Sequence, residues 1–129
     1  MKFVRISYGV AAAYGIVTLL PLYFLIGKVG HDAPPPITHP EFYYGFVGLA
    51  ILWQLVFILI AKDPLRYLSI IPITILEKAV YSVPVLILYS FGRVHKNIIL
   101  PSLVDPIFGV LFMAAYLKVR DLVSERTAS

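Results

Sequence analysis

Residues 42–64 read FYYGFVGLAILWQLVFILIAKDP, and this stretch decides the fold class. Its first twenty residues contain no charged side chain and a single amide, Gln54. A helix that crosses the apolar core of a bilayer needs about 20 mostly apolar residues. We therefore predict a membrane-spanning helix over residues 42–61, followed by a tight polar turn at Lys62-Asp63-Pro64.

Three further apolar stretches lie on either side of this one. They predict spans over residues 6–26, 65–91 and 98–117. The composition agrees, because 60% of the 129 residues are hydrophobic and only 14% are charged, against about 45–50% and about 25% in soluble domains. So short a chain could not bury that much apolar surface in water. We predict an all-α fold in which residues 1–129 form one transmembrane domain, an integral membrane four-helix bundle.

Composition also excludes several kinds of site. The chain has no cysteine, which rules out disulfides, thiolate metal sites and cysteine nucleophiles. Its net charge of +4 is distributed between apolar stretches. The basic residues are therefore interpreted as topology signals, and no nucleic-acid partner is expected.

Polar residues and prolines mark the predicted helix ends. Thr38 and Glu41 have the spacing of a capping box, with Pro40 in the first turn of the second span. Asp63 and Pro64 predict the N-cap and the first residue of the third span.

The two connections around the second span differ in character. Residues 28–40 contain three consecutive prolines, which predict an extended loop. The connection at Lys62 and Asp63 is short, so the second and third spans are expected to be antiparallel neighbours.

Basic residues and tyrosines predict the orientation of the bundle. Cytoplasmic loops carry an excess of Lys and Arg, so the richer side is expected to be cytoplasmic and to hold both termini. That side has Lys2, Arg5, Lys62, Arg66, Lys118, Arg120 and Arg126, and the other has Lys28, Arg93 and Lys96. Tyrosines form belts at both boundaries, with Tyr8, Tyr67 and Tyr116 inside and Tyr23, Tyr43, Tyr44 and Tyr89 outside.

Six polar residues are expected to share one layer of the membrane. A rise of about 1.5 Å per residue places them ~10 to ~20 Å from the cytoplasmic end of a ~30 Å apolar core. They come from all four spans and are Tyr14, Gln54, Glu77, Lys78, Tyr81 and Asp105. A charge at this depth costs roughly 2.5–3.5 kcal/mol, so such residues are expected to face the bundle interior. These six are the candidate ligand-binding site or buried polar cluster.

Two main interpretations of this layer stay open, beside a third in which Lys78 extends toward the interface and the cluster does not assemble. In the first, Lys78 and Asp105 form a buried ion pair that sets helix register, while a neutral Glu77 bonds to Tyr14 or Gln54. In the second, Glu77 and Asp105 line a pocket for a lipophilic ligand or a proton path.

Prolines predict distortions in the later spans. Pro106 removes a backbone hydrogen bond to Ser102, so the fourth span is expected either to kink or to break, with Asp105 capping a new helix. Pro72 and Pro84 are expected to bend the third span.

Two other features of the sequence bear on possible sites. His31, His39 and His95 lie on the predicted outer side without the spacing of a metal site, so no metal or cofactor is predicted. Small residues in the first span, with Gly9 and Ala13 among them, permit close packing within the bundle or against a partner protein.

The layout resembles the small four-helix membrane proteins of the DoxX-like kind. The resemblance rests on length, four spans, the short inner loop Ala61-Lys62-Asp63-Pro64, and the acidic Glu77 and Asp105 in later spans. It implies a bundle in a bacterial inner membrane. The chain is also distantly similar to EXPERA-type bundles, which use carboxylates and aromatics around an intramembrane pocket, but it differs in the lysine beside Glu77 and in having one tryptophan.

Three hypotheses for function follow. The first is a non-enzymatic polytopic membrane protein whose polar layer binds a small lipophilic ligand. The second is an accessory subunit that contacts a membrane protein partner or a second copy of itself. The third is an intramembrane enzyme or proton-coupled transporter that uses Glu77 and Asp105; no catalytic residue is assigned.

Overall fold

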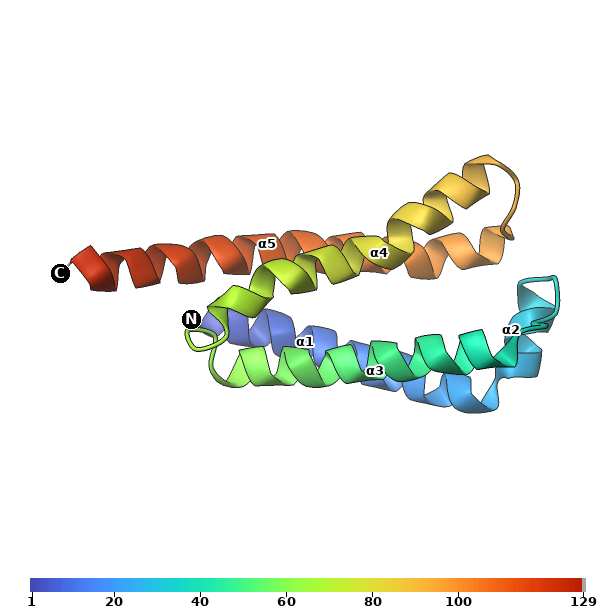
Figure 1. The fold of residues 1–129 in the computed structure, drawn as a ribbon, viewed down its shortest axis with the longest axis horizontal. Coiled ribbons are helices and arrows are strands. Elements are labelled where there is room, and N and C mark those ends of the chain that lie inside the picture. Colours follow the sequence, from blue (N-terminus) through green and yellow to red (C-terminus); the bar gives the residue numbers. More distant parts are fainter. Residues whose placement is uncertain (129) are drawn as a thin grey trace.

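The computed structural model describes residues 1–128, whose regular structure is entirely helical (Figure 1). Its segments are α1 (Lys2–Leu19), η1 (Leu20–Phe24), α2 (Ile26–Asp32), α3 (Pro40–Lys62), η2 (Leu68–Ile70), α4 (Ile71–Ser90), η3 (Lys96–Ile98) and α5 (Ile99–Ala128). Four stretches are long and apolar enough to cross a membrane, as predicted: Lys2–Phe24, Pro40–Lys62, Leu68–Ser90 and Lys96–Ala128.

The long helices form two pairs. α1 packs against α3, α4 packs against α5, and α1 also contacts α5. Both termini lie at the same end of the bundle (Figure 1). α3 and α4 are antiparallel, as their short connection predicted, but each packs mainly against another helix. The expectation that they pack as neighbours is therefore wrong, because residues 63–70 are long enough to bring α4 against α5.

The closely packed core occupies the half of the bundle nearest the termini. It consists of side chains from all four long helices: Val4, Tyr8, Ala11, Ala12, Phe57, Ile60, Ile71, Phe108, Phe112, Ala115 and Val119. In the other half, α4 bends away from α5 (yellow in Figure 1), and Pro84 lies inside this helix. A proline ring clashes with the carbonyl one turn earlier and bends a helix, so the expectation for Pro84 is confirmed. The helices diverge where the candidate site lies.

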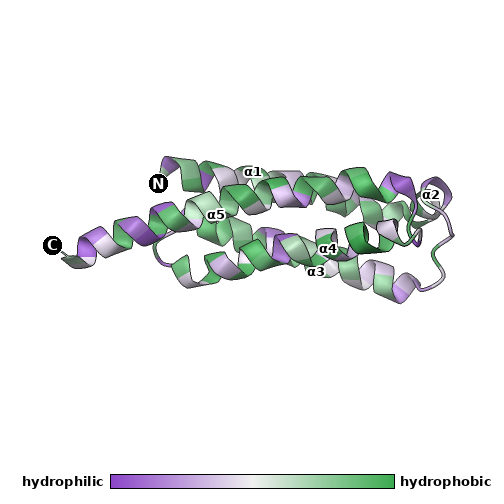
Figure 2. Cartoon of the chain, turned by 90° about the horizontal axis from the view of Figure 1, so that it is seen from above, coloured by the Kyte–Doolittle hydropathy of each residue, from purple (hydrophilic) through white to green (hydrophobic). Residues whose placement is uncertain are grey.

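The outer surface of the bundle is apolar along its length. Large hydrophobic side chains are exposed on every long helix, among them Val17, Phe42, Val80 and Leu100. Figure 2 shows hydrophobic residues along the sides and hydrophilic residues concentrated toward the two ends. Such a surface is stable in an apolar solvent and would be an aggregation surface in water.

The ends of α3 differ from the prediction. Pro40 is in its first turn, as expected, but the N-cap is His39 and no side chain caps the helix. The Thr38–Glu41 capping box is therefore wrong, since the Glu41 carboxylate lies 3.1 Å from Nδ1 of His39 instead. Asp63 is the C-cap of α3.

Asp63 does not begin α4, so its predicted role as N-cap of the third span is wrong. Its Oδ1 accepts a bond from the Arg66 backbone N–H at 3.3 Å, which closes a separate turn. α4 begins at Ile71 with Pro72 in its first turn. A proline there removes no helical hydrogen bond, so the bend expected at Pro72 does not form.

The outer connection contains a helix that the three prolines did not predict. α2 covers Ile26–Asp32, and an ion pair of 2.7 Å joins Lys28 to Asp32 one turn later. Pairs at this spacing stabilise short helices. The extended stretch is limited to the residues between α2 and α3.

α5 passes through Pro106 without interruption, so the helix break is excluded. The proline leaves the carbonyl of Ser102 without its helical donor. The hydroxyl of Ser82 on α4 donates to this carbonyl at 2.7 Å and replaces the missing bond. α5 also continues as a helix to Ala128, beyond the predicted end of the span at Leu117.

We expect Ser82→Ala to leave the Ser102 carbonyl unsatisfied and to lower the free energy of unfolding by about 1–3 kcal/mol. The double variant Ser82→Ala/Pro106→Ala supplies a backbone N–H at position 106 and should recover most of this loss. Ser90→Ala is the control, because that hydroxyl is exposed and bonds within its own helix. Unfolding in detergent measures all three, and a double variant as unstable as Ser82→Ala would contradict the assignment.

Candidate functional site

A buried polar stripe runs along the inner face of α4. Thr74, Lys78 and Ser82 follow one another at intervals of four residues, which places them on one helix face, and all three are buried. Thr74 Oγ1 donates to the carbonyl of Ile71 at 2.6 Å. The hydroxyl of Tyr8 on α1 lies 2.8 Å from the same Oγ1 and therefore donates to it.

Tyr8 does not belong to the inner tyrosine belt, and that prediction is wrong. Its side chain is completely buried, and its ring stacks on Phe112 with centroids 4.1 Å apart. Because Thr74 provides a partner for the hydroxyl, the residue is stable inside the bundle and does not need the interface.

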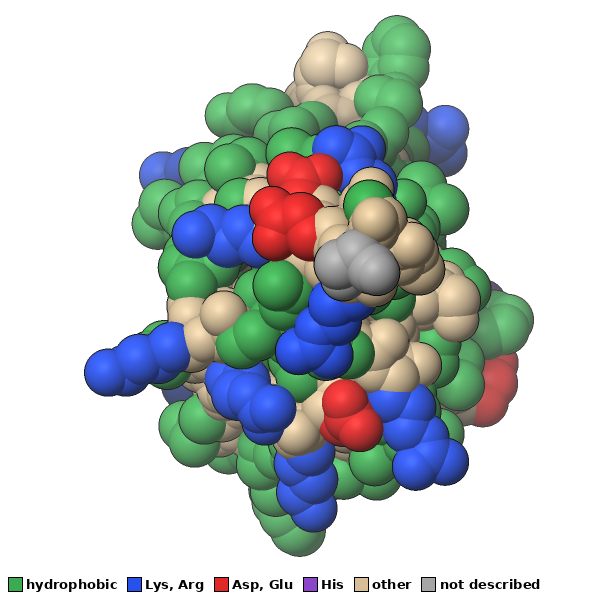
Figure 3. Space-filling model, turned by 90° about the vertical axis from the view of Figure 1, so that its left-hand side faces the viewer, with side chains coloured by type: hydrophobic (Ala, Val, Ile, Leu, Met, Phe, Trp, Pro, Cys, Tyr) green, Lys and Arg blue, Asp and Glu red, His purple; other side chains and the backbone are tan. Residues whose placement is uncertain are grey.

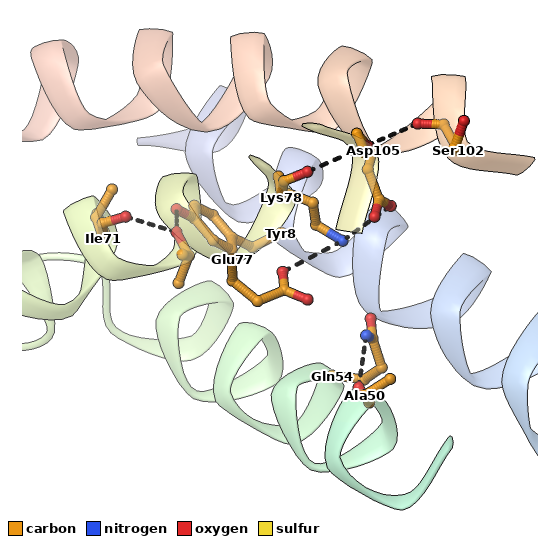
Figure 4. A network of polar contacts seen from close by, with 10 residues as sticks. Tyr8, Ala50, Gln54, Ile71, Glu77, Lys78, Ser102 and Asp105 are labelled. Atoms are coloured by element: carbon orange, nitrogen blue, oxygen red, sulfur yellow. Dashed lines mark hydrogen bonds and ion pairs between the residues drawn. The ribbon is translucent and has the colours of Figure 1, made fainter. Parts of the chain in front are cut away.

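Lys78 is the charged centre of the stripe (Figure 4). Its Nζ lies 3.6 Å from Oδ1 of Asp105 on α5 and 3.6 Å from Oε2 of Glu77 on its own helix. Adjacent residues on a helix point about 100° apart, but the flexible lysine stem lets the ammonium group reach both carboxylates. Lys78 thus links α4 to α5 and forms an ion pair with its neighbour, although 3.6 Å is too long for a hydrogen bond to Glu77 Oε2.

Phenyl rings surround the other side of the ammonium group. Nζ lies 4.9, 5.7 and 6.0 Å from the ring centroids of Phe57, Phe108 and Phe112. A cation over an aromatic face within about 6 Å is attracted by the ring quadrupole. The positive charge therefore lies between an aromatic core and two carboxylates, without direct contact with the bundle's exterior.

The cluster contains more acid than base. Glu77 and Asp105 supply two carboxylates against one ammonium group, and Oε2 of Glu77 is buried without a hydrogen-bond donor among the described residues. Buried polar atoms are satisfied in the great majority of folded proteins. An unsatisfied acceptor at this position is therefore a place where a further donor could bind.

Gln54 supplies a second open acceptor from α3. It is 3% exposed, and its Nε2 donates to the carbonyl of Ala50 at 2.8 Å, whereas Oε1 has no donor in residues 1–128. The carboxamide occupies the position where a Cβ of residue 15 would lie, so Gly15 on α1 makes room for it.

All six candidate residues line one cavity. It has a volume of about 660 Å³, is open on one side, and is lined by side chains of the four long helices and η1. Tyr14, Gln54, Glu77, Lys78, Tyr81 and Asp105 are all in its wall. Figure 4 shows the Glu77, Lys78, Asp105 and Gln54 side chains directed toward a common space. The polar layer and the cavity are the same region.

One detail of the first interpretation is wrong. Glu77 does not bond to Tyr14 or Gln54, because its carboxylate turns to Lys78 and the Gln54 amide turns to its own helix. The two tyrosines contribute rings to the site. Tyr14 lies against Phe108 with centroids 5.7 Å apart, and Tyr81 lies against Phe46 at 5.4 Å.

The histidines do not assemble into a metal site in the described part of the chain. His31 Nδ1 lies 3.2 Å from Asp32, and His39 forms a separate pair with Glu41. Asp32 lies outside the long helices. The hydrogen bond from Lys28, with a smaller contribution from His31, holds the pKa of its carboxyl below the ordinary value.

The sequence indicated the charged residues but not their surroundings. Phe57, Phe108, Phe112, Tyr8 and Ser102 were not expected to take part in the cluster. Phe108 and Phe112 do occupy the same helix face one turn apart, which was an available signal. Phenylalanines are so common in apolar helices that this spacing alone does not distinguish a cation's surroundings from lipid-facing positions.

Comparison of the chain with protein-family models, with curated proteins and with solved structures finds no match. The resemblance to DoxX-like proteins therefore stays a prediction from the sequence. Function has to be argued from the chain's own geometry.

Removing the ammonium group should be costly. We expect Lys78→Met to lower the free energy of unfolding by at most roughly 3–5 kcal/mol, because two partly buried carboxylates lose their counter-charge. The triple variant Lys78→Met/Glu77→Gln/Asp105→Asn removes the charges together and should regain most of the stability. Thermal unfolding of the purified proteins measures the difference. A single variant as stable as the triple variant would show that Lys78 does not hold the carboxylates.

Proposed function

We propose that this chain is a polytopic integral membrane protein that binds a small lipophilic molecule inside its helix bundle. The proposed role is non-enzymatic. The supporting observation is the cavity of about 660 Å³ whose wall combines apolar side chains with a few polar groups at mid-length of the helices.

The size and lining of the cavity suit a small molecule. Ligand pockets are typically about 300–1,000 Å³, mostly apolar, with a small number of polar groups that orient the ligand. Leu19, Leu22, Phe46 and Val104 form part of the apolar wall here. The open acceptors on Gln54 and Glu77 supply the orienting groups.

The proposed orientation places both termini in the cytoplasm. Figure 3 shows the end where the termini lie, and basic side chains outnumber acidic ones on this face. An excess of Lys and Arg favours retention on the cytoplasmic side. The proposed location, a bacterial inner membrane, rests on the resemblance to DoxX-like proteins.

An accessory role in a larger membrane complex is the second candidate. Gly15 faces the bundle interior and leaves space for the Gln54 side chain. By contrast, a Cβ built at Gly9 would contact no other atom, and Ala13 is exposed. The Gly9–Ala13 pair is therefore free to pack against another membrane helix. The third hypothesis is catalysis or proton transport by Glu77 and Asp105, and the contacts described above do not test it.

The ligand proposal predicts a co-purifying molecule. Extraction of the protein from mild detergent, followed by mass spectrometry, should find a lipophilic compound enriched over bulk lipid. Ala50→Phe places a ring in the cavity and should abolish the enrichment. Ala79→Phe makes the same change on an exposed face of α4 and is the control. Absence of enrichment in the unmodified protein, or equal enrichment in Ala50→Phe, would contradict the proposal.

The orientation predicts the outcome of reporter fusions. A fluorescent protein fused after the C-terminus should fluoresce, because it folds in the cytoplasm. Alkaline phosphatase inserted between α2 and α3 should be active, because that loop is placed in the oxidising compartment. The converse pattern would reverse the orientation without affecting the bundle itself.

A further inference from the structure

A second cavity continues the first toward the end opposite the termini. It also has a volume of about 660 Å³ and lies between α2, the loop after it, and the beginnings of α3 and α5. The two cavities share four lining residues: Leu22, Phe46, Tyr81 and Pro101. We call these four residues the waist. Because they share these lining residues, the two cavities are adjacent along the bundle axis.

One stripe of α3 runs along both cavities. Phe42 lines the outer cavity, Phe46 lines both, and Ala50 and Gln54 line the inner one. These residues are four apart and occupy one helix face. With about 1.5 Å of rise per residue, the stripe is ~18 Å long. The combined space is therefore elongated, which suits an extended chain better than a compact molecule.

The two ends of this combined space differ in whether their polar side chains already have hydrogen-bond partners. At the outer end, Lys28 and Asp32 pair with each other at 2.7 Å, and Asn97 donates to the Asp32 carbonyl at 2.6 Å. At the inner end, the acceptors Gln54 Oε1 and Glu77 Oε2 are buried without donors in the described chain. A polar head can donate hydrogen bonds to both acceptors at the inner end, where Glu77 Oε2 keeps only its 3.6 Å ion pair with Lys78.

The inner end selects against an anion. Two carboxylates face one ammonium group there, and that ammonium group is also engaged by three phenyl rings. Both open acceptors require a donor. The waist and the outer cavity are mainly apolar, with Leu22, Leu25, Val29, Ile37 and Ile98 in their walls.

We propose that the two cavities together hold one single-chain amphiphile. Its head carries a hydrogen-bond donor, a hydroxyl or an ammonium group, and binds at Gln54 and Glu77. Its alkyl tail passes the waist and occupies the outer cavity. This inference rests on the proposed function and adds the chemical class and the direction of the ligand.

Photo-crosslinking of the full chain in lipid nanodiscs tests the direction. The probes are two tetradecanols, one with a diazirine beside the hydroxyl and one with a diazirine at the tail end. The first should label the inner wall around Ala50 and Gln54, and the second should label the outer wall around Phe42 and Ile37. Excess tetradecanol should suppress both. Reversed positions, or labels only on lipid-facing residues, would overturn the inference.

A block at the waist tests whether one molecule fills both cavities. Leu22→Trp should weaken the binding of tetradecanol by about tenfold, a change easily resolved in competition assays. It should weaken the binding of hexanol much less, because the shorter chain does not have to pass the waist. Leu20→Trp is the matched control, since Leu20 is exposed and lines neither cavity. Equal losses for both chain lengths would overturn the shared-ligand model.

Head-group competition tests the donor. Tetradecanol or tetradecylamine should displace the probe, and the stronger competitor of the two identifies the preferred head group. Tetradecanoate should compete poorly. Equal competition by tetradecanoate would overturn the donor requirement. If hexanol competes but chain length and Leu22→Trp have no effect, the inference fails while the proposed function survives. If none of these amphiphiles competes, the inference fails, and the co-purification experiment with Ala50→Phe decides the proposed function separately.

Discussion

An ammonium group in an apolar helix bundle must be surrounded by compensating groups, and the surroundings of Lys78 involve three of the four long helices. Asp105 and two phenylalanines come from α5, Phe57 comes from α3, and Glu77 comes from α4 itself. A buried pair often adds little net stability, but removing one partner leaves an uncompensated charge. The cluster therefore constrains how α4 can rotate and slide against α5 more than it strengthens the bundle.

Lys78 also marks the division of the bundle into two unlike halves. Toward the termini, Tyr8, Phe57 and Phe112 pack ring against ring and leave no described polar group unsatisfied. Toward the other end, the helices separate and line the two partly open cavities. A packed half gives the structure its rigidity, so the open half can hold polar groups with unused capacity. Binding sites on rigid scaffolds need this division of roles.

Backbone defects in the open half are compensated from neighbouring helices. Pro106 removes a donor from α5, and Ser82 of α4 supplies one to the Ser102 carbonyl. The hydroxyl of Tyr43 on α3 also donates to the carbonyl of Leu22 at 2.6 Å, which additionally accepts from the Leu25 N–H at 3.2 Å where the chain leaves regular α-helix. In lipid, every backbone group must find a partner inside the protein. These side chains let the helices bend and widen the space between them without exposing unpaired carbonyls.

The sequence by itself determined how many helices could span a membrane. It also determined that an even number of them brings both termini to one end, and that Gln54, Lys78 and Asp105 lie near one level along the bundle. Those properties depend on local hydropathy and on a constant rise per residue. Only the tertiary structure decided which helices pair and which groups the Glu77 and Gln54 side chains contact. It alone also decided that phenylalanines surround Lys78. Rotation about each helix axis controls these contacts, and the outward and buried faces of the helices are both apolar here. The hydrophobic periodicity of the sequence therefore carries almost no information about how each helix is rotated about its axis, and tertiary packing decides that rotation.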